Sequence, residues 1–278
     1  MNCKKTDEAS FLSSYNVNDY DRPSVATDVA VFSMFKEAPD SHRKDGESKL
    51  HILLVKRGEH PFMNKWALPG GFLKADETIE ACALREVKEE TNVSPEAILP
   101  VGIFSDPQRD PRARVISAAY ASVVNAETVQ VSGGSDALNA KWFYVDFSFS
   151  EDKTFKLRLE CEGEEDILAE LKEFETGGFT RKFETVLNTG SAFDHAAIIA
   201  TALYEMRSKA ENYEITFKFL PRKFTLADLQ RVQETLMGIS LLTANFRRKI
   251  ATLVEETDEY TEGIGHRPAR LFKRKEII

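Results

Sequence analysis

The chain has 278 residues, of which 42% are hydrophobic and 29% are charged. This ordinary balance excludes a wholly disordered chain, and it provides enough apolar sequence for one large domain or two smaller ones. The net charge of −8 excludes a chain that is polycationic throughout. However, residues 216–278 hold 12 Lys and Arg against 8 Asp and Glu, a net charge of +4, which leaves −12 for the rest. An acidic body with a basic end predicts two functions on one chain.

The sequence predicts neither a membrane span nor a cysteine-based framework. Its longest apolar runs fall far short of the roughly 20 residues that a spanning helix needs. The N-terminal stretch lacks the apolar segment of a secretory signal. Cys3, Cys82 and Cys161 are far apart and form no C-x-x-C pair, so we expect free thiols. These features predict a cytoplasmic protein without a membrane partner.

The first half of the chain alternates strand-like and polar segments. A polar arm, residues 1–20, precedes two strand-like runs over 28–35 and 51–57, with a charged loop between them. A helical segment over 78–91 follows. Three more strand-like runs come after it, over 99–104, 115–124 and 141–147. Strands on both sides of one helix predict a mixed sheet packed by helices, an α/β or α+β sandwich.

Helical patterns then cover residues 164–174 and 193–210, after which the composition changes. The alternating apolar segment ITFKF, residues 215–219, ends just before Pro221. We therefore place a domain boundary near residue 210. The predicted organisation is a polar arm (1–20), a first domain (21–210) and a second domain (211–278).

The helix over 78–91 carries a concentration of carboxylates. Glu86 lies three and four residues before Glu89 and Glu90, so all three share one helix face and their like charges repel. A divalent cation that prefers oxygen ligands, Mg²⁺ or Mn²⁺, would relieve this repulsion. Arg85 beside them can pair with a carboxylate and orient it. The alternative interpretation is a solvated helix face rich in Glu and Lys.

The spacing around these residues resembles the Nudix box, G-x5-E-x7-R-E-U-x-E-E-x-G-U, in which U is a bulky aliphatic residue. The matching residues are Gly71, Glu77, Arg85, Glu86, Val87, Glu89, Glu90 and Val93. The second glycine of the box is Asn92 here, and asparagine tolerates the left-handed conformation of a helix end. Gly70 and Gly71 before the helix can adopt a positive φ and approach a ligand closely.

This resemblance implies a Nudix α/β/α sandwich with a mixed sheet and a metal-holding loop–helix–loop that cleaves nucleoside diphosphates linked to another moiety. By the resemblance, Glu86, Glu89 and Glu90 are metal ligands, Arg85 orients them, and Glu77 supports the box. The implied ion is Mg²⁺, with Mn²⁺ as the alternative. A bound metal lowers the pKa of its water and offsets charge on the pyrophosphate. The catalytic base is left open.

An arginine-rich stretch indicates the kind of substrate. Arg109, Arg112 and Arg114 precede a strand, and guanidinium groups suit pyrophosphate oxygens, although a surface turn with scattered charges is the alternative. The stretch resembles the DPRGRVxSxAY-like segment of ADP-ribose-type Nudix proteins, which implies ADP-ribose or a related nucleotide-sugar. Arg57 and Trp66 are further candidates for the site, and packing or a surface position is their alternative role.

The basic end of the chain is predicted to begin with two helices. Thr225 and Asp228 form a capping-box pattern with Asp in place of Glu, and Gly238 is expected to end the first helix. Thr243 can cap the second helix. The apolar stripe of this second helix is predicted to contain Phe246, Ile250, Leu253 and Val254.

A turn with two glycines and a basic strand follow, so the order is that of a winged helix-turn-helix domain. In such a domain the second helix enters the major groove and the wing touches backbone phosphates. The residues predicted to contact DNA are Asn245, Arg247, Arg248 and Lys249 on the second helix, with Arg267, Arg270 and Lys273 on the wing. The alternative is a small helical cap or a dimerisation element with a charged surface.

Together, the two parts resemble the Nudix-related transcriptional regulators of the NrtR type, and SAFDHAAII at residues 191–199 is similar to the linker of that group. The resemblance implies a Nudix domain that binds ADP-ribose or another sugar-linked effector, and a winged helix that binds double-stranded operator DNA as a homodimer. Many such proteins have lost the box glutamates. Because this chain keeps them, we also expect hydrolysis of ADP-ribose-like compounds. The alternatives are a plain Nudix hydrolase whose last domain serves dimerisation, and a repressor whose Nudix pocket only senses ligand.

Overall fold

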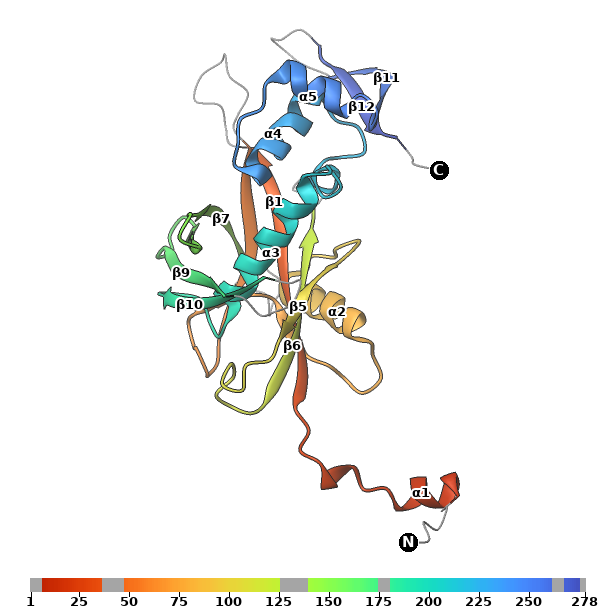
Figure 1. Cartoon of the computed structure of the whole chain (residues 1–278), viewed down its shortest axis with the longest axis vertical. Helices are drawn as coiled ribbons and strands as arrows, with labels where there is room; N and C mark the ends of the chain where they lie inside the picture. Colours follow the sequence, from red (N-terminus) through yellow and green to blue (C-terminus); the bar gives the residue numbers. More distant parts are fainter. Residues whose placement is uncertain (1–6, 37–47, 126–139, 175–180, 262–267, 276–278) are drawn as a thin grey trace.

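The computed structural model describes residues 7–36, 48–125, 140–174, 181–261 and 268–275. Its centre is one large mixed sheet (Figure 1). The strands of this sheet are β1 (Ser24–Lys36), β2 (Ser48–Lys56), β3 (Trp66–Ala67), β4 (Gly70–Phe72), β5 (Leu99–Phe104), β6 (Val115–Val123), β7 (Ala140–Phe149), β8 (Thr154–Glu160), β9 (Ile167–Phe174) and β10 (Lys182–Asn188). Their order is β10-β9-β8-β7-β2-β1-β6-β5, with β3 beside β2 and β4 beside β1. The β1–β6 pair is parallel and the β1–β2 pair antiparallel.

Helices cover both faces of the sheet. The helices and 3₁₀ turns are α1 (Glu8–Ser14), η1 (Val17–Asp19), α2 (Ile79–Thr91), α3 (His195–Ala210), η3 (Thr216–Phe219), α4 (Leu226–Met237) and α5 (Thr243–Ile250). Successive side chains of a strand point to opposite faces. Accordingly, Val29 and Val31 of β1 pack in one apolar cluster with Val87 of α2, whereas Ala30 and Phe32 pack in another with α3. The structure therefore confirms the α/β/α sandwich with a mixed sheet.

The C-terminal elements gather at one end of the molecule, opposite the N-terminal arm (Figure 1). They are α4, α5 and an antiparallel hairpin of β11 (Val254–Tyr260) and β12 (Arg270–Arg274). A small core joins them, with Leu229, Phe246 and Ile250 among its buried members. Val232 and Leu236, on another face of α4, belong instead to the main core with α3. One helix therefore ties this small winged helix region to the sheet.

The prediction of a helix over residues 164–174 is wrong, because β9 occupies most of this segment. Ile167, Ala169 and Leu171 are buried at alternate positions, and β8 and β10 pair with β9 on its two sides. Neither of those neighbouring strands was expected, so the pairing that decides the conformation could not be anticipated. The segment ITFKF, for which the sequence predicted no particular element, contains the 3₁₀ turn η3.

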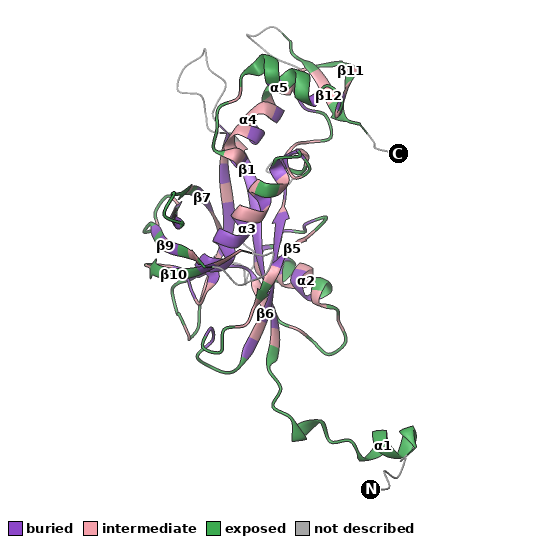
Figure 2. Ribbon diagram, in the orientation of Figure 1, coloured by how far each residue is buried: buried purple, intermediate pink, exposed green. Residues whose placement is uncertain are grey.

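The N-terminal arm carries α1, whose residues are all exposed (Figure 2). No helix in the described ranges is long and apolar enough to cross a membrane. Cys82 and Cys161 are free cysteines, as expected, while Cys3 falls outside the described part of the chain.

Candidate functional site

Helix α2 holds the carboxylate cluster and has well-defined ends. The hydroxyl of Thr78 accepts a hydrogen bond from the N–H of Ala81 at 3.2 Å, which caps the first turn. At the other end Asn92 adopts the left-handed conformation with φ 60°, and its N–H donates to the carbonyl of Lys88. The expectation that Asn92 preserves this helix end is therefore confirmed. Cys82, Ala83 and Val87 are buried against the sheet, which turns the glutamates outward.

Arg85 connects three of the carboxylates. Its Nε and Nη2 donate to the two oxygens of Glu77 at 2.9 and 2.6 Å, which forms a two-pronged pair. Its Nη1 donates to Glu86 at 2.6 Å and to Glu89 at 3.1 Å. The hydrogen bonds from Arg85 lower the pKa of Glu77 to about 2. Arg85 is thus placed to orient carboxylates on the face of α2.

Glu90 approaches the glycines before α2 most closely. Its Oε2 accepts a hydrogen bond from the N–H of Gly70 at 3.0 Å. Burial raises the pKa of Glu90 to about 7, with the negative charges of Glu86 and Asp28 adding to the effect. Glu90 therefore lies close to other carboxylates that repel its negative charge. A bound cation would relieve this repulsion.

The two glycines are required by close contacts, not by a positive φ. In the described ranges, glycines with positive φ are Gly163 and Gly238, so the expectation of a positive φ at Gly70 and Gly71 is wrong. A Cβ on Gly70 would lie 2.1 Å from the carbonyl oxygen of Thr27, and one on Gly71 would lie 2.5 Å from the Glu86 carboxyl. Gly70 must therefore be glycine for β4 to lie this close to the backbone of β1, whereas a side chain at Gly71 would require the Glu86 carboxyl to move.

A pocket of about 280 Å³ lies beside Glu90. Its walls come from β1, β2, β4, the arginine-rich loop and the start of α3. The predicted site residues that line it are Arg57, Gly70, Gly71, Glu90, Arg109 and Arg112. The remaining predicted box residues, Glu77, Arg85, Glu86 and Glu89, lie on α2 or just before it, outside this pocket lining.

Two guanidinium groups and aromatic rings form the rim of this pocket. Arg57 lies 4.8 Å from the ring centre of Phe193, and Arg112 lies 5.7 Å from the same ring and 5.5 Å from that of Phe72. Arg112 also forms a two-pronged pair with Asp110 at 3.0 and 2.7 Å. Such a rim offers cations to phosphate oxygens and flat faces to an aromatic base.

Trp66 and Arg114 do not take the positions expected of them. Trp66 is 5% exposed and packs edge-on against Phe143 at 4.8 Å, so it belongs to the core. Arg114 is exposed, and its Nη1 donates to the carbonyl of Asp106 at 3.3 Å, away from the pocket lining. The alternation of side chains along β3 places Trp66 in the core, and the direction of the loop takes Arg114 away from the pocket. The residue types alone reveal neither position.

Arg109 lies at the pocket floor within a buried ion network. Its Nε and Nη2 donate to the Asp194 carboxylate at 2.9 and 2.7 Å, and Nη2 also reaches Asp28 at 3.1 Å. Asp28 further accepts from Ser117 at 2.5 Å and lies 3.3 Å from Nε2 of His195. Two carboxylates therefore already hold Arg109, unlike a free phosphate-binding arginine.

Burial alone would raise the pKa of Asp28, but its hydrogen bonds with His195 and Ser117 and the charge of Arg109 hold it well below its usual range. His195 also accepts a hydrogen bond from the Leu68 N–H at its Nδ1, at 2.9 Å. The sequence reasoning missed Asp28, Asp194 and His195 as site residues. The available signals were an acidic residue inside an apolar strand and the DH pair in SAFDHAAII.

The donor set near Gly71 fits a hard divalent cation in its chemistry, because it consists of carboxylates crowded against one another. Within the described ranges, however, no three metal-binding side chains are gathered around one point. Arg85 holds Glu86 and Glu89, while Gly70 holds Glu90.

The winged helix region confirms most of the predicted local pattern. Thr225 and Asp228 form the reciprocal capping box at the start of α4, and Gly238 ends that helix with φ 64°. Helix α5 differs, because its N-cap is Leu242 without a side-chain cap bond and the helix ends at Ile250. The predictions that Thr243 caps the helix and that Leu253 and Val254 continue its apolar stripe are therefore wrong. Val254 instead starts β11, whose pairing with β12 ends the helical segment.

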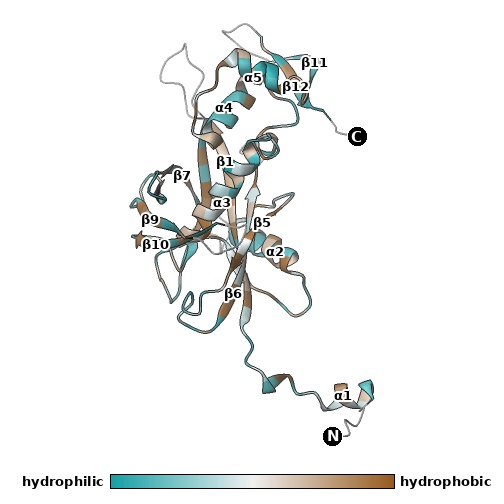
Figure 3. Ribbon diagram, viewed as in Figure 1, coloured by the Kyte–Doolittle hydropathy of each residue, from teal (hydrophilic) through white to brown (hydrophobic). Residues whose placement is uncertain are grey.

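Helix α5 presents its cations to solvent. Asn245, Arg247, Arg248 and Lys249 are all exposed, while Phe246 and Ile250 face the small core. Figure 3 shows that the ribbon of α5, at the end of the molecule, is coloured mostly as hydrophilic. This arrangement suits contact with a negatively charged groove.

The predicted cations of the wing are paired within the hairpin. Arg270 pairs with Glu256 and also donates to the hydroxyl of Tyr260. Lys273 pairs with Glu255 at 2.6 Å. Arg267 lies outside the described part of the chain. The acidic strand β11, which the sequence reasoning did not recognise, therefore offsets much of the positive charge of the wing.

Comparison with known proteins agrees with both parts. Residues 42–157 match the NUDIX domain family, and residues 216–273 match the NrtR DNA-binding winged helix domain. An ADPR-responsive transcriptional repressor from Acinetobacter baylyi is 27% identical over 270 residues, 96% of this chain and 88% of the relative. A MutT/nudix family protein from Enterococcus faecalis has a TM-score of 0.73 and 28% identity, covering 98% of this chain and 95% of that one. NrtR from Shewanella oneidensis in complex with a 27mer DNA has a TM-score of 0.60 and 26% identity, covering 90% and 93%.

The fold, the carboxylate helix and the domain match define a Nudix domain, which typically uses a divalent metal. A DNA-binding winged helix domain follows it. The chain therefore carries a Nudix domain followed by an NrtR winged helix domain, and nearly its whole length is similar to a repressor that responds to ADPR.

Proposed function

We propose that the protein is an ADP-ribose-responsive transcriptional regulator that binds ADP-ribose through its Nudix domain and operator DNA through its winged helix. The observation that carries this proposal is that one chain joins a cation-rimmed pocket to an exposed cationic helix, α5, through α4, which packs in both the main core and the small core. The Acinetobacter baylyi relative, described as an ADPR-responsive repressor, matches nearly the whole chain.

The pocket suits the parts of ADP-ribose. Arg57 at the rim offers a cation to the pyrophosphate, and Arg112 can do so once its pair with Asp110 opens. The rings of Phe72 and Phe193 beside them offer faces on which adenine can stack. Arg109, which is already held by two carboxylates, supports the floor of the pocket instead of contacting phosphate.

Helix α5 is the element proposed to enter the major groove. Its exposed Asn245 and Arg248 can contact base edges, and its other cations can contact phosphates. The chain is proposed to act as a homodimer, because two copies related by a two-fold axis match the symmetry of a palindromic operator.

Fluorescence anisotropy tests the regulator. The protein is titrated into a labelled duplex that carries a palindrome from upstream of its gene, and into a scrambled duplex, with and without ADP-ribose in EDTA. We expect the palindrome to bind at least about 10³-fold tighter than the scrambled duplex and ADP-ribose to change that affinity. Equal binding to both duplexes, or no response to ADP-ribose, would contradict the proposal. AMP together with ribose 5-phosphate serves as the ligand control.

A second candidate function is hydrolysis of ADP-ribose, favoured by the complete set Glu77, Arg85, Glu86, Glu89 and Glu90. Glu86, Glu89 and Glu90 would hold Mg²⁺, or alternatively Mn²⁺. When bound, such an ion lowers the pKa of a water molecule and offsets pyrophosphate charge. Glu77 keeps Arg85 in place through a two-pronged pair, and Arg85 orients the Glu86 and Glu89 carboxylates.

Release of AMP from ADP-ribose, with and without Mg²⁺, tests the hydrolase. We expect Mg²⁺-dependent release that Glu89→Gln lowers by at least about 10²-fold. The matched control is Glu80→Gln, because Glu80 lies exposed in the first turn of the same helix. Absence of turnover at high protein concentration would leave a sensor without catalysis, and full activity of Glu89→Gln would exclude the assigned role of Glu89.

A further inference from the structure

Helix α3 begins beside the Nudix pocket. Phe193, immediately before it, lines the pocket in a left-handed conformation with φ 50°. Asp194 and His195, at its first turn, bind Arg109 and Asp28 in the buried network under the pocket. His195 also accepts the Leu68 N–H, two residues before Gly70. The start of α3 is therefore part of the structure that shapes the pocket.

The far end of α3 contacts the winged helix. The Nε of Arg207 donates to the carbonyl of Leu236 at 3.3 Å, and a Cβ on Gly238 would lie 2.4 Å from an Arg207 nitrogen. Gln233 of α4, which is 3% exposed, donates to the carbonyl of Ala210, the last residue of α3, at 2.9 Å. Arg207 also lies over the ring of Phe147 in the sheet, at 5.2 Å. These contacts attach the last turn of α3 to the last two turns of α4.

Helix α4 holds the turn that precedes α5, so the two helices are connected rigidly. Gln230 donates to the carbonyl of Leu241 at 2.9 Å, and Glu234 accepts the Leu241 N–H at 2.7 Å, so the turn before α5 is held by α4. Leu229 and Phe246 pack in the small core that the two helices share. A shift of α4 therefore changes the position of the exposed cations on α5.

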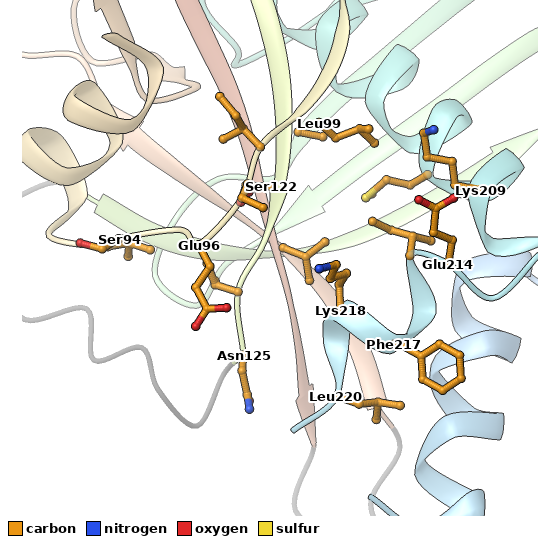
Figure 4. Close-up of a pocket in the computed structure, with 18 of the residues that line it drawn as sticks. Ser94, Glu96, Leu99, Ser122, Asn125, Lys209, Glu214, Phe217, Lys218 and Leu220 are labelled. Atoms are coloured by element: carbon orange, nitrogen blue, oxygen red, sulfur yellow. The ribbon is translucent and has the colours of Figure 1, made fainter. Parts of the chain in front are cut away.

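The corner between α3 and η3 has room to move. A cavity of about 920 Å³ separates this corner from the end of the sheet at β5 and β6. Figure 4 shows Lys209, Glu214 and Lys218 on one side of the hollow and Leu99, Ser122 and Asn125 on the other. Met206 and Ile215 still pack in the main core with Leu99 of β5, so the open space lies on the side of Lys209, Glu214 and Lys218.

We propose that α3 couples the two sites, with Asp194 and His195 as positioning residues of the effector pocket and Arg207 as the contact that carries the position of the helix to α4. This inference rests on the proposed function. As an α-helix of 16 residues, α3 spans about 24 Å. ADP-ribose can change DNA affinity only if it binds two arrangements of the protein unequally. The contact of ligand with Phe193 and with the loop held by His195 provides that difference at the start of α3.

The experiment measures the coupling factor, which is the ratio of the Kd for operator DNA with and without saturating ADP-ribose. Such factors commonly lie at about 5–150. We expect Arg207→Met to bring the factor at least about threefold closer to 1. Arg207→Lys, which keeps a cation over Phe147, should partly restore the coupling. Asp194→Asn should reduce it from the other end of the helix.

Ser208→Ala is the matched control, because Ser208 is exposed on the same turn of α3. Its coupling factor should equal that of the wild type. Should Arg207→Met fail to fold, Arg207→Lys and Asp194→Asn still decide the matter. If Arg207→Lys and Asp194→Asn both fold and both keep the wild-type coupling factor, the inference is overturned. The proposed function as a regulator would still stand. If the wild type binds DNA without any response to ADP-ribose, the proposed function fails first, and the coupling role of α3 fails with it.

Discussion

The charges beneath the Nudix pocket form one network in which each carboxylate has a cationic partner. Asp28 accepts hydrogen bonds from Ser117 and Arg109 and lies beside His195, and Asp194 holds Arg109 from the other side. The side chains of Arg109 and Asp28 are only 4% and 10% exposed. In such a place the loss of one charge leaves its partners buried with incomplete compensation.

Asp28→Asn should therefore lower the free energy of unfolding by about 3 kcal/mol, measured by urea denaturation. The matched control is Asp166→Asn, which removes one partner from the exposed pair with Arg158. Because that pair is largely solvated, its loss should cost less than about 1 kcal/mol. Similar losses in the two variants would contradict the buried network.

The pH dependence of this effect has a definite sign. The pKa of Asp28 is held below the value of about 3.9 that it has in an unfolded chain. Its stabilisation is therefore fully present above about pH 4 and is lost as the pH falls toward the folded pKa. The difference in stability between wild type and Asp28→Asn should therefore shrink as the pH falls below about 4.

Among the elements, helix α5 and the wing differ in how much charge they can offer to DNA. The cations of α5 are exposed, and no ion pair within the described ranges involves Arg247, Arg248 or Lys249. On the wing, Arg270 and Lys273 each have an acidic partner on β11. Binding DNA through the wing would first require these pairs to be broken.

Arg248→Ala should therefore weaken operator binding about tenfold and lower the slope of log Kd against log salt by about 1, measured by anisotropy at several salt concentrations. Arg270→Ala should weaken binding less than about threefold. Glu256→Gln, which frees Arg270, should strengthen binding. An equal loss in both alanine variants, with no gain in Glu256→Gln, would show that the wing pairs open in the complex.

For the whole molecule, α4 decides whether the two domains behave as separate units. Leu236 lies in the main core with α3 and the sheet, whereas Leu229 lies in the small core with α5. Both side chains are almost fully buried on one helix. Substitution of Leu236 therefore tests the contact between the two domains, and substitution of Leu229 tests the packing of the winged helix itself.

Leu236→Ala should lower the thermal midpoint detected by tryptophan fluorescence, because both tryptophans, Trp66 and Trp142, lie in the sheet. The expected cost is about 2–5 kcal/mol. Leu229→Ala should weaken DNA binding but shift the tryptophan transition less. Equal shifts in the two variants would mean that the whole chain unfolds as one cooperative unit.

The local predictions held where short-range chemistry decides the structure. Thr225 caps α4 because its hydroxyl reaches the N–H of Asp228, and Asn92 ends α2 because it tolerates a positive φ. The local predictions failed where pairing between strands that are far apart in the sequence decides the structure. Residues 164–174 have a helix-compatible pattern, yet β8 and β10 draw Ile167–Phe174 into the sheet. In the same way, strand pairing takes Val254 out of the expected helix.

The sequence by itself determined the carboxylate helix, the order of the two domains and the cations of α5, because each depends on residue types at fixed short spacings. The tertiary structure alone decided that Trp66 belongs to the core and that Arg109 is held by Asp28 and Asp194. It also decided that acidic partners offset the positive charge of the wing. It also joined both domains through α3 and α4. The physical reason is that partners far apart in sequence meet only after folding. Burial and charge compensation then decide which groups stay free to bind.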